Sequence, residues 1–225
     1  MFLVEDFFDL ADEDLALAFE GATFVWDALR NCPKVAKKLT ENAVILGTVH
    51  PTAVLEGPVY VGEGSIIGPH VYIKGPTYIG RHTEIRQGAF LRENSIIGDN
   101  CVVGHATETK SSIMLKGSHA PHFAYVGDSI LGQKVNLGAG TKLSNFKLQG
   151  NEIIIYHNGE IYPTGLRKMG AIIGDRSLTG CNTVTAPGTL IGSDSWVYSQ
   201  ISLRGYIPPR SIVKPEMGFR IEQKR

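Results

Sequence analysis

A six-residue repeat of aliphatic side chains constrains this chain more than any other feature of its sequence. Repeats of short, fixed period predict a solenoid, in which each unit buries its apolar face against its neighbours. A hexapeptide period is typical of short strands joined by tight turns, three strands to a coil, with the aliphatic residue pointing inward. The repeat therefore predicts an all-β, triangular, parallel β-helix. Its inward positions fall in one register at Val49, Leu55, Val61, Ile67, Ile73, Ile79, Ile85, Leu91, Ile97, Val103, Thr109 and Leu115.

A second, smaller side chain accompanies each aliphatic residue four positions later. Cys101 occupies one of these small positions, so it is predicted to be core rather than chemistry. Glycine often follows the aliphatic residue directly, as at Gly62 and Gly98, which we attribute to turn geometry and not to a phosphate-binding loop. The small positions are Ala53, Val59, Ser65, Val71, Thr77, Thr83, Ala89, Ser95, Cys101 and Thr107.

The repeat is interrupted in its second half. Beyond Leu115 it resumes at Val126 and Leu131, which implies one five-residue face in each of these two steps. An irregular segment follows at about 145–170, and its alternating residues around Asn158-Gly159 predict a β-hairpin. Long insertions in a compact fold are usually functional. The repeat then returns at Ile173, Thr179, Thr185, Ile191, Val197 and Leu203.

These patterns divide the chain into three parts. Residues 1–42 lack the repeat and carry apolar residues at helical spacing, with Gly21 between two expected helices, so they predict a helical hairpin that covers the open end of the solenoid. Residues 43–210 form the β-helix, which we expect to end at Pro208-Pro209. Residues 211–225 are predicted to be a tail that is a short helix or disordered.

Composition excludes several kinds of partner. The 225 residues include 22 basic and 22 acidic side chains, a balance that gives no electrostatic footprint for nucleic acid or a membrane surface. The N-terminus does not resemble a signal peptide, and no apolar run approaches a membrane span. The three cysteines are widely spaced, without a CxxC pair. We therefore predict a reduced, cytoplasmic protein.

The segment 121–145 points to a narrower group of proteins than the repeat alone. It contains His-x-x-Tyr-x-Gly-Asp at 122–128, Val-Asn-x-Gly-Ala-Gly-Thr at 135–141, and then Asn145. It resembles the C-terminal acetyltransferase half of the bifunctional enzyme that makes UDP-N-acetylglucosamine, and the C-terminal halves of related sugar-1-phosphate nucleotidyltransferases. The resemblance covers roughly residues 45–205. It implies a left-handed coil and a homotrimer with its sites between subunits.

The same resemblance implies an acetyl-CoA-dependent N-acetyltransferase that acts on an amino-sugar phosphate, with glucosamine-1-phosphate as the expected acceptor. His122 would be the general base, a task suited to an imidazole whose ordinary pKa is about 6.5, and Asn145 would orient the acyl group or the histidine. No metal is required, because a thioester is already activated. The residues implied to bind substrate are Arg86, Lys110 and Lys168 for the phosphate and Tyr125 and Asn136 for the sugar. Those implied to lie along acetyl-CoA are Ala139, Cys181 and Ser199.

Other interpretations remain open at this point. Bulky Tyr198 and Gln200 stand where the family has small residues along acetyl-CoA, so a non-catalytic module that binds a sugar nucleotide or regulates a partner is the alternative. A γ-type carbonic anhydrase would need three histidines around zinc, and His119 and His122 lack a well-placed third. Residues 1–45 do not resemble the Gly-rich loop that opens a pyrophosphorylase domain, so that activity is not expected.

Overall fold

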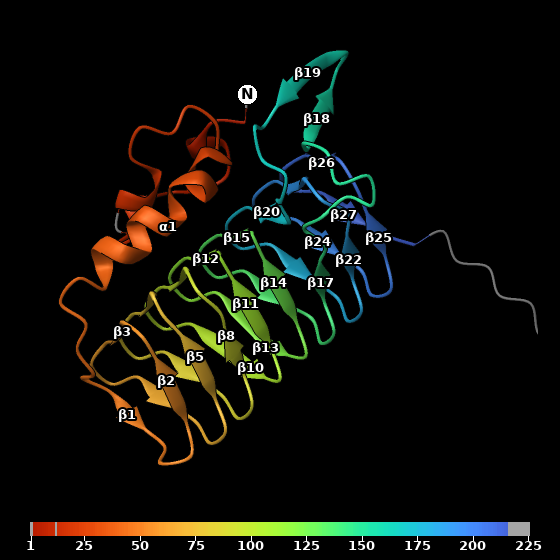
Figure 1. The fold of residues 1–225 in the computed structure, drawn as a ribbon. Helices are drawn as coiled ribbons and strands as arrows, with labels where there is room; N and C mark the ends of the chain where they lie inside the picture. The colour runs from red at the N-terminus through yellow and green to blue at the C-terminus, as the bar shows by residue number, and fades with distance from the viewer. Residues whose placement is uncertain (1, 12, 216–225) are drawn as a thin grey trace, which may run out of the picture.

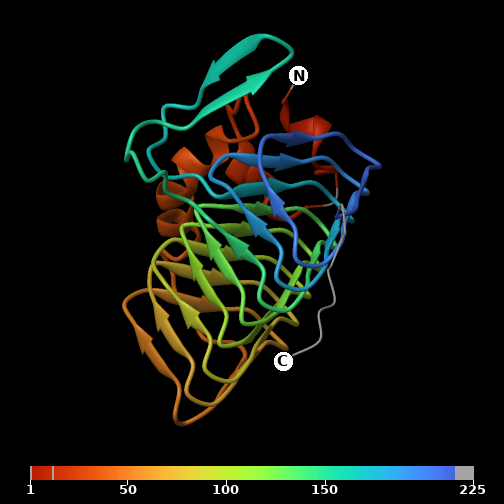
Figure 2. The same ribbon diagram turned by 90° about the vertical axis from the view of Figure 1, so that its right-hand side faces the viewer.

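The protein is a left-handed parallel β-helix, as predicted, with a short helical segment along its side (Figures 1 and 2). The computed structural model describes residues 2–11 and 13–215. Three parallel sheets form the walls of the triangular coil, and successive strands of each sheet come from successive coils. The predicted tail, 211–225, lies mostly outside the described residues.

Sheet 1 has nine strands: β1 (Thr48–Val49), β4 (Ile66–Ile67), β7 (Glu84–Ile85), β10 (Val102–His105), β13 (His119–His122), β16 (Asn136–Leu137), β21 (Leu178–Thr179), β24 (Trp196–Val197) and β27 (Ile212–Val213). Sheet 2 has eight: β2 (Val54–Glu56), β5 (Tyr72–Lys74), β8 (Phe90–Leu91), β11 (Glu108–Lys110), β14 (Tyr125–Gly127), β17 (Lys142–Leu143), β22 (Val184–Thr185) and β25 (Ser202–Leu203). Sheet 3 has eight: β3 (Val59–Val61), β6 (Thr77–Ile79), β9 (Ser95–Ile97), β12 (Ile113–Met114), β15 (Ile130–Leu131), β20 (Ala171–Ile173), β23 (Thr189–Ile191) and β26 (Tyr206–Ile207).

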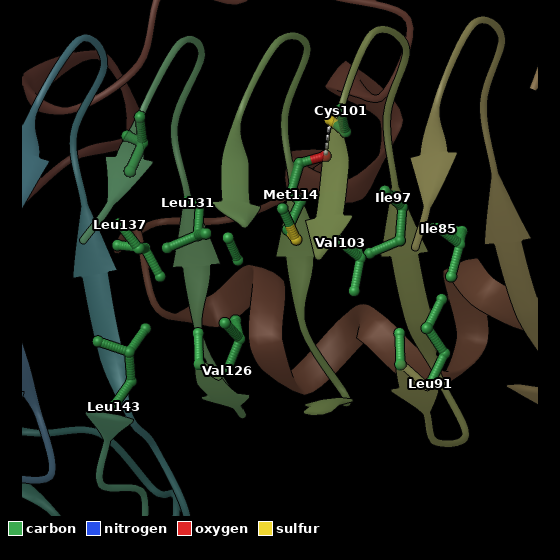
Figure 3. Close-up of a cluster of buried hydrophobic side chains, with 14 of the residues drawn as sticks. Ile85, Leu91, Ile97, Cys101, Val103, Met114, Val126, Leu131, Leu137 and Leu143 are labelled. Carbon is green, nitrogen blue, oxygen red and sulfur yellow. Dashed lines mark hydrogen bonds between the residues drawn. The ribbon is translucent and has the colours of Figure 1, made fainter. Parts of the chain in front are cut away.

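The inward-facing residues form a single aliphatic core inside the coil (Figure 3). One position differs from the predicted register: Met114, not Leu115, pairs with Ile97 below and Leu131 above. The shortened face therefore lies between Thr109 and Met114, one face earlier than expected. Leu115 is buried against the N-terminal segment and not in the core of the coil, which explains why this position is also apolar.

Gly62, one of the glycines that directly follow an inward residue, is required by close approach between coils and not by a positive φ. A Cβ at Gly62 would lie 2.6 Å from the backbone of Gly80 in the next coil. Positive φ values occur instead at turn residues such as His70 and Asn100. The turn explanation is therefore wrong for Gly62, because the backbone of the neighbouring coil leaves no room for a side chain at this position.

The N-terminal segment covers the flank of sheet 3 rather than the open end of the coil (Figure 1). It contains η1 (Val4–Asp6), η2 (Ala16–Phe19) and one α-helix, α1 (Asp27–Leu39), and so is not the expected hairpin of two helices. Outward-facing aliphatic residues of sheet 3 explain this placement, because a sheet with two apolar faces needs a cover on its outer face. These residues are Ile96, Ile113, Ile130, Ile172 and Leu190, all fully buried.

The insertion forms the predicted hairpin. Strands β18 (Ile154–His157) and β19 (Glu160–Pro163) pair antiparallel around Asn158 and Gly159, which both adopt positive φ. The hairpin stands out from the end of the solenoid that carries β26 (Figure 1). The prediction that the β-helix ends at Pro208-Pro209 was wrong, because β27 follows these prolines and adds one more strand to sheet 1.

Candidate functional site

A hollow of about 310 Å³ lies along the edge of sheet 2 where the chain turns towards sheet 3. We call it the cation hollow, because three basic side chains from three separate segments line it. It brings together four of the residues that the sequence singled out, namely Lys110, Tyr125, Asn145 and Lys168, and adds Arg92 and Phe146. Phe146 and Lys168 form an antiparallel bridge where the insertion leaves and rejoins the solenoid. The insertion therefore completes the wall of the hollow.

Asp128 holds two of the side chains that line the cation hollow. Its carboxylate accepts hydrogen bonds from Lys110 Nζ at 2.9 and 3.0 Å and from Asn145 Nδ2. The Lys110 and Asp128 side chains are only 15% and 13% exposed, so this pair is far better shielded than a surface ion pair. Asp128 also lies in a turn, with a φ of +47°, so it combines a backbone role with this side-chain role.

Helix α1 packs close to Asp128. Cys32 on α1 donates a hydrogen bond from Sγ to the carbonyl oxygen of Asn94 at 3.1 Å. Burial, with a smaller contribution from nearby Asp128, raises the pKa of Cys32 to about 12. The covering segment therefore packs close enough to the cation hollow to help fix its geometry.

Tyr125 depends on a glycine two residues later. A Cβ at Gly127 would lie 2.5 Å from the Tyr125 hydroxyl oxygen, so only glycine allows the ring to lie where it does. In this position the hydroxyl accepts a hydrogen bond from Asn145 Nδ2 at 3.1 Å. Burial, followed by the charge of Glu108, raises the pKa of Tyr125, which keeps the phenol protonated and able to donate to a ligand.

Arg86, the arginine chosen from the sequence, does not line this hollow. It is exposed after β7 and forms an ion pair with Glu84, with Nη2 2.8 Å from Oε2. Arg92 lines the hollow instead of Arg86. It lies one coil from Lys110, in the same column of sheet 2. A hydrogen bond to Glu108 raises the pKa of Arg92, so its charge is permanent. The separation of 18 residues between Arg92 and Lys110, three hexapeptides, was the sequence signal that could have identified it.

A second group of candidates lies at the other edge of sheet 2, where the chain turns in from sheet 1. We call it the corner row: His122, Ala139, Cys181 and Ser199, one residue from each of four successive coils. Backbone hydrogen bonds hold the row together, with Gly140 N donating to His122 O at 3.0 Å and Gln200 N donating to Cys181 O at 2.9 Å. His122, Cys181 and Ser199 are exposed.

Within one chain the two groups remain apart. Ala139 of the corner row and Asn145 of the cation hollow lie at opposite edges of sheet 2, on either side of β17. Asn136 lies elsewhere again, on sheet 1, paired with His119. The structure thus does not place Asn145 or the phosphate-binding candidates next to His122 of the same chain.

No group of three or more His, Cys, Asp and Glu side chains could hold a metal ion within residues 2–11 and 13–215. No helix in the same ranges is long and apolar enough to cross a membrane.

The chain is similar in sequence to one described family and to several curated proteins. The family described as the GMPPB C-terminal domain matches residues 73–162. The chain is 34% identical over 200 residues to the bifunctional protein GlmU of Methanococcus aeolicus, covering 89% of this chain and 48% of that protein. It is also 34% identical over 174 residues to the bifunctional sugar-1-phosphate nucleotidylyltransferase/acetyltransferase of Sulfurisphaera tokodaii, covering 77% and 41%.

The chain thus spans less than half the length of these curated relatives. Among solved structures, the UDP-N-acetylglucosamine acyltransferase of Francisella novicida aligns with a TM-score of 0.49 and 15% identity, covering 72% of this chain and 60% of that one. The chain is a hexapeptide-repeat left-handed β-helix protein, homologous to the part of these bifunctional sugar-1-phosphate proteins that it matches.

Proposed function

We propose that this protein is an N-acetyltransferase that uses acetyl-CoA to acetylate an amino sugar carrying a 1-phosphate, with glucosamine-1-phosphate as the first acceptor to test. The observation that carries the proposal is the cation hollow. Arg92, Lys110 and Lys168 surround a space of about 310 Å³ that also contains the amide of Asn145 and the phenol of Tyr125. Convergent basic side chains suit a phosphate dianion, and neighbouring neutral donors suit sugar hydroxyls.

The reaction needs one group to accept a proton. As the amine nitrogen forms a bond to the acyl carbon, the carbon–sulfur bond of the thioester breaks and His122 takes the proton that the amine releases. That proton can then pass to the departing thiolate, which leaves as the thiol and returns His122 to its starting state. No ring nitrogen of His122 is engaged in a hydrogen bond with residues 2–11 or 13–215, so the imidazole is free for this task.

The corner row fits an extended acyl donor. Ala139, Cys181 and Ser199 have short side chains that stack along one corner in the three coils after His122. Gly140, with φ +75°, adds no side chain at the same turn. Acetyl-CoA, when bound there, would supply the activated acetyl group, and the backbone N–H of Ala139 would stabilise negative charge on the acyl oxygen.

A homotrimer resolves the separation between the corner row and the cation hollow. Sheet 3 is covered by the N-terminal segment, so sheets 1 and 2 are the faces left for contact with other copies. Sheet 1 exposes a column of apolar residues, including Leu178, Trp196 and Ile212, that a second copy would bury. We therefore propose that the corner row and Asn136 of one subunit meet the cation hollow of its neighbour.

Lys110 provides the test of acceptor binding. Thiol release from acetyl-CoA should require an amine acceptor and should be fastest with an amino-sugar 1-phosphate among the unphosphorylated, 1-phosphate and 6-phosphate forms. Lys110→Ala should raise the KM for that acceptor at least tenfold, because a charge-assisted contact is lost, while the KM for acetyl-CoA stays constant. Lys134→Ala is the control, because it removes an exposed lysine from the turn between sheet 3 and sheet 1. Acetyl-CoA binding without turnover of any amine would favour the non-catalytic alternative.

Cysteine labelling tests the donor site without measuring turnover. Cys181 is exposed, whereas Cys32 and Cys101 are buried and burial raises the pKa of each to about 12. One thiol per chain should react rapidly with a disulfide reagent in the native protein, and three should react after denaturation. Acetyl-CoA should slow the labelling of Cys181, and free acceptor should not. Unchanged labelling at saturating acetyl-CoA would place the donor away from the corner row.

A further inference from the structure

A second, larger hollow adjoins the cation hollow along sheet 2. Its volume is about 750 Å³, against about 310 Å³ for the cation hollow. We call it the insertion groove, because the insertion forms one wall with Phe146, Leu148, Ile155 and Tyr156, while sheet 2 and the turns after β22 and β25 form the floor. Phe146 lines both hollows, so they lie next to each other. A sugar phosphate would fill the first and leave the second unused.

The wall of the insertion groove is anchored firmly. Arg30 of α1 donates a hydrogen bond from Nη2 to Thr164 O at 2.6 Å. Phe2 packs edge-on against Tyr162 of the hairpin, with ring centroids 5.2 Å apart. Lys147 donates from Nζ to Glu152 O at 2.7 Å, which closes the loop before the hairpin on itself. The N-terminal segment therefore holds the hairpin in place, and the groove is part of the folded structure.

The far end of the groove carries its own cation. Arg204 is exposed in the turn after β25 and lines the groove. It occupies the same column of sheet 2 as Lys110, four coils further on, with Gly127, Ser144 and Ala186 between them. Four steps of about 4.8 Å place the two backbones about 19 Å apart. Short side chains at the intervening positions keep the floor low between the two cations.

We infer that the protein acetylates a nucleoside diphosphate-linked amino sugar, in which the 1-phosphate is joined to a nucleoside monophosphate through a pyrophosphate bond. This inference rests on the proposed function and specifies its substrate class. The sugar and the pyrophosphate occupy the cation hollow, where Arg92, Lys110 and Lys168 can donate hydrogen bonds to the phosphate oxygens. The nucleoside extends past Phe146 into the insertion groove.

The chemistry of the insertion groove suits a nucleoside. Phe146 and Tyr156 are 46% and 65% exposed, so both offer ring surface on which a base can stack. Ser144, Gln149 and Ser202 add hydroxyl and amide groups at the rim and floor, which can bond to the base edge or the ribose. Arg204 can reach a ribose oxygen or stack on the base. The extended length of a nucleoside diphosphate sugar matches the span from Lys110 to Arg204.

Arg204→Ala and Tyr156→Ala test this inference, with Lys74→Ala as the matched control. Lys74 lies in the same column as Arg92 and Lys110 but on the side away from the groove. Rates are measured with an amino-sugar 1-phosphate and with the uridine and guanosine diphosphate forms of the same sugar. In the wild type one nucleotide-linked form should have a kcat/KM at least tenfold above that of the 1-phosphate. Arg204→Ala and Tyr156→Ala should raise its KM about tenfold and leave the KM for the 1-phosphate unchanged, while Lys74→Ala changes neither.

Calorimetric titration with UDP and GDP separates this inference from the proposed function. Binding of either nucleotide to the wild type that is weakened in Arg204→Ala supports the groove even if no acceptor is acetylated. Equal rates for the 1-phosphate and nucleotide-linked forms, with no nucleotide binding at millimolar concentration, would overturn it. It would equally be overturned if Arg204→Ala changed only the KM for acetyl-CoA, or if it changed the oligomeric state, since the groove would then hold the acyl donor or a second copy.

Discussion

Replacing His122 with alanine should lower kcat for acetyl transfer by about 10²- to 10⁴-fold, the usual contribution of a positioned general base. The side chain is exposed at the end of β13, so its loss should leave the fold and the thermal unfolding temperature nearly unchanged. The KM for acetyl-CoA should also change little, because the donor is held along the corner row by the shorter side chains of Ala139 and Ser199. The measurement is steady-state thiol release with the best acceptor of the panel.

His119 offers a control from the same strand. It lies three residues before His122 in β13, is half-buried, and pairs with Asn136 on the face of sheet 1. His119→Ala should raise the KM for the acceptor if Asn136 contacts the sugar, but it should spare kcat. Equal turnover by the wild type and His122→Ala would remove His122 from the mechanism, and a kcat lost only in His119→Ala would move the base to that residue.

Gly104→Ala should destabilise the protein by about 3 kcal/mol or more. A Cβ at this position would lie 1.6 Å from the carbonyl oxygen of Pro121 in the next coil, and a backbone atom cannot move aside as the end of a side chain can. The thermal unfolding temperature should therefore fall by about 6–12 °C for a chain of this size. Pro121 immediately precedes His122, so any folded fraction should also lose activity.

Gly68→Ala is the matched control for this substitution. Gly68 occupies the equivalent position of an earlier coil, but its nearest contact for a Cβ is 3.1 Å, and other coils carry Arg86 or Tyr198 in the same column. Its cost should be about 1 kcal/mol or less, measured by thermal and denaturant unfolding. If the two variants unfolded at the same temperature, close approach between coils would not explain why glycine is needed at position 104.

The cation hollow shows which site residues sequence reasoning brought together and which it missed. Tyr125 and Asn145 could be chosen because they belong to a recognisable motif of fixed spacing, and Lys110 because the resemblance extends beyond that motif. Asp128 belongs to the same motif but was not among the chosen site residues, although its carboxylate holds both Lys110 and Asn145. Arg86 was chosen from the resemblance, and the repeat does not distinguish it from Arg92, because both follow an inward aliphatic residue. Only the fold shows that one faces Glu84 at one corner while the other lies beside Lys110 at the next.

The sequence by itself determined the coil. A six-residue period can bury its aliphatic positions only if each face of the solenoid takes one unit, so register, strand direction and core follow from local spacing. The Asn158-Gly159 turn is equally local, because both residues tolerate positive φ.

Only the tertiary structure decided what lies against the coil. An apolar segment such as residues 2–39 can cover an open end or a flank. The segment covers sheet 3 because the outward residues Ile96, Ile113 and Ile130 form one apolar surface there. These residues come from three different coils, so the surface exists only after the coil has formed. The insertion groove arises in the same way, since the hairpin is fixed by Phe2 and Arg30, more than 120 residues away in the chain. Contacts of such sequence separation leave no periodic trace, so the position of the cover, the groove and the cation hollow could be established only in three dimensions.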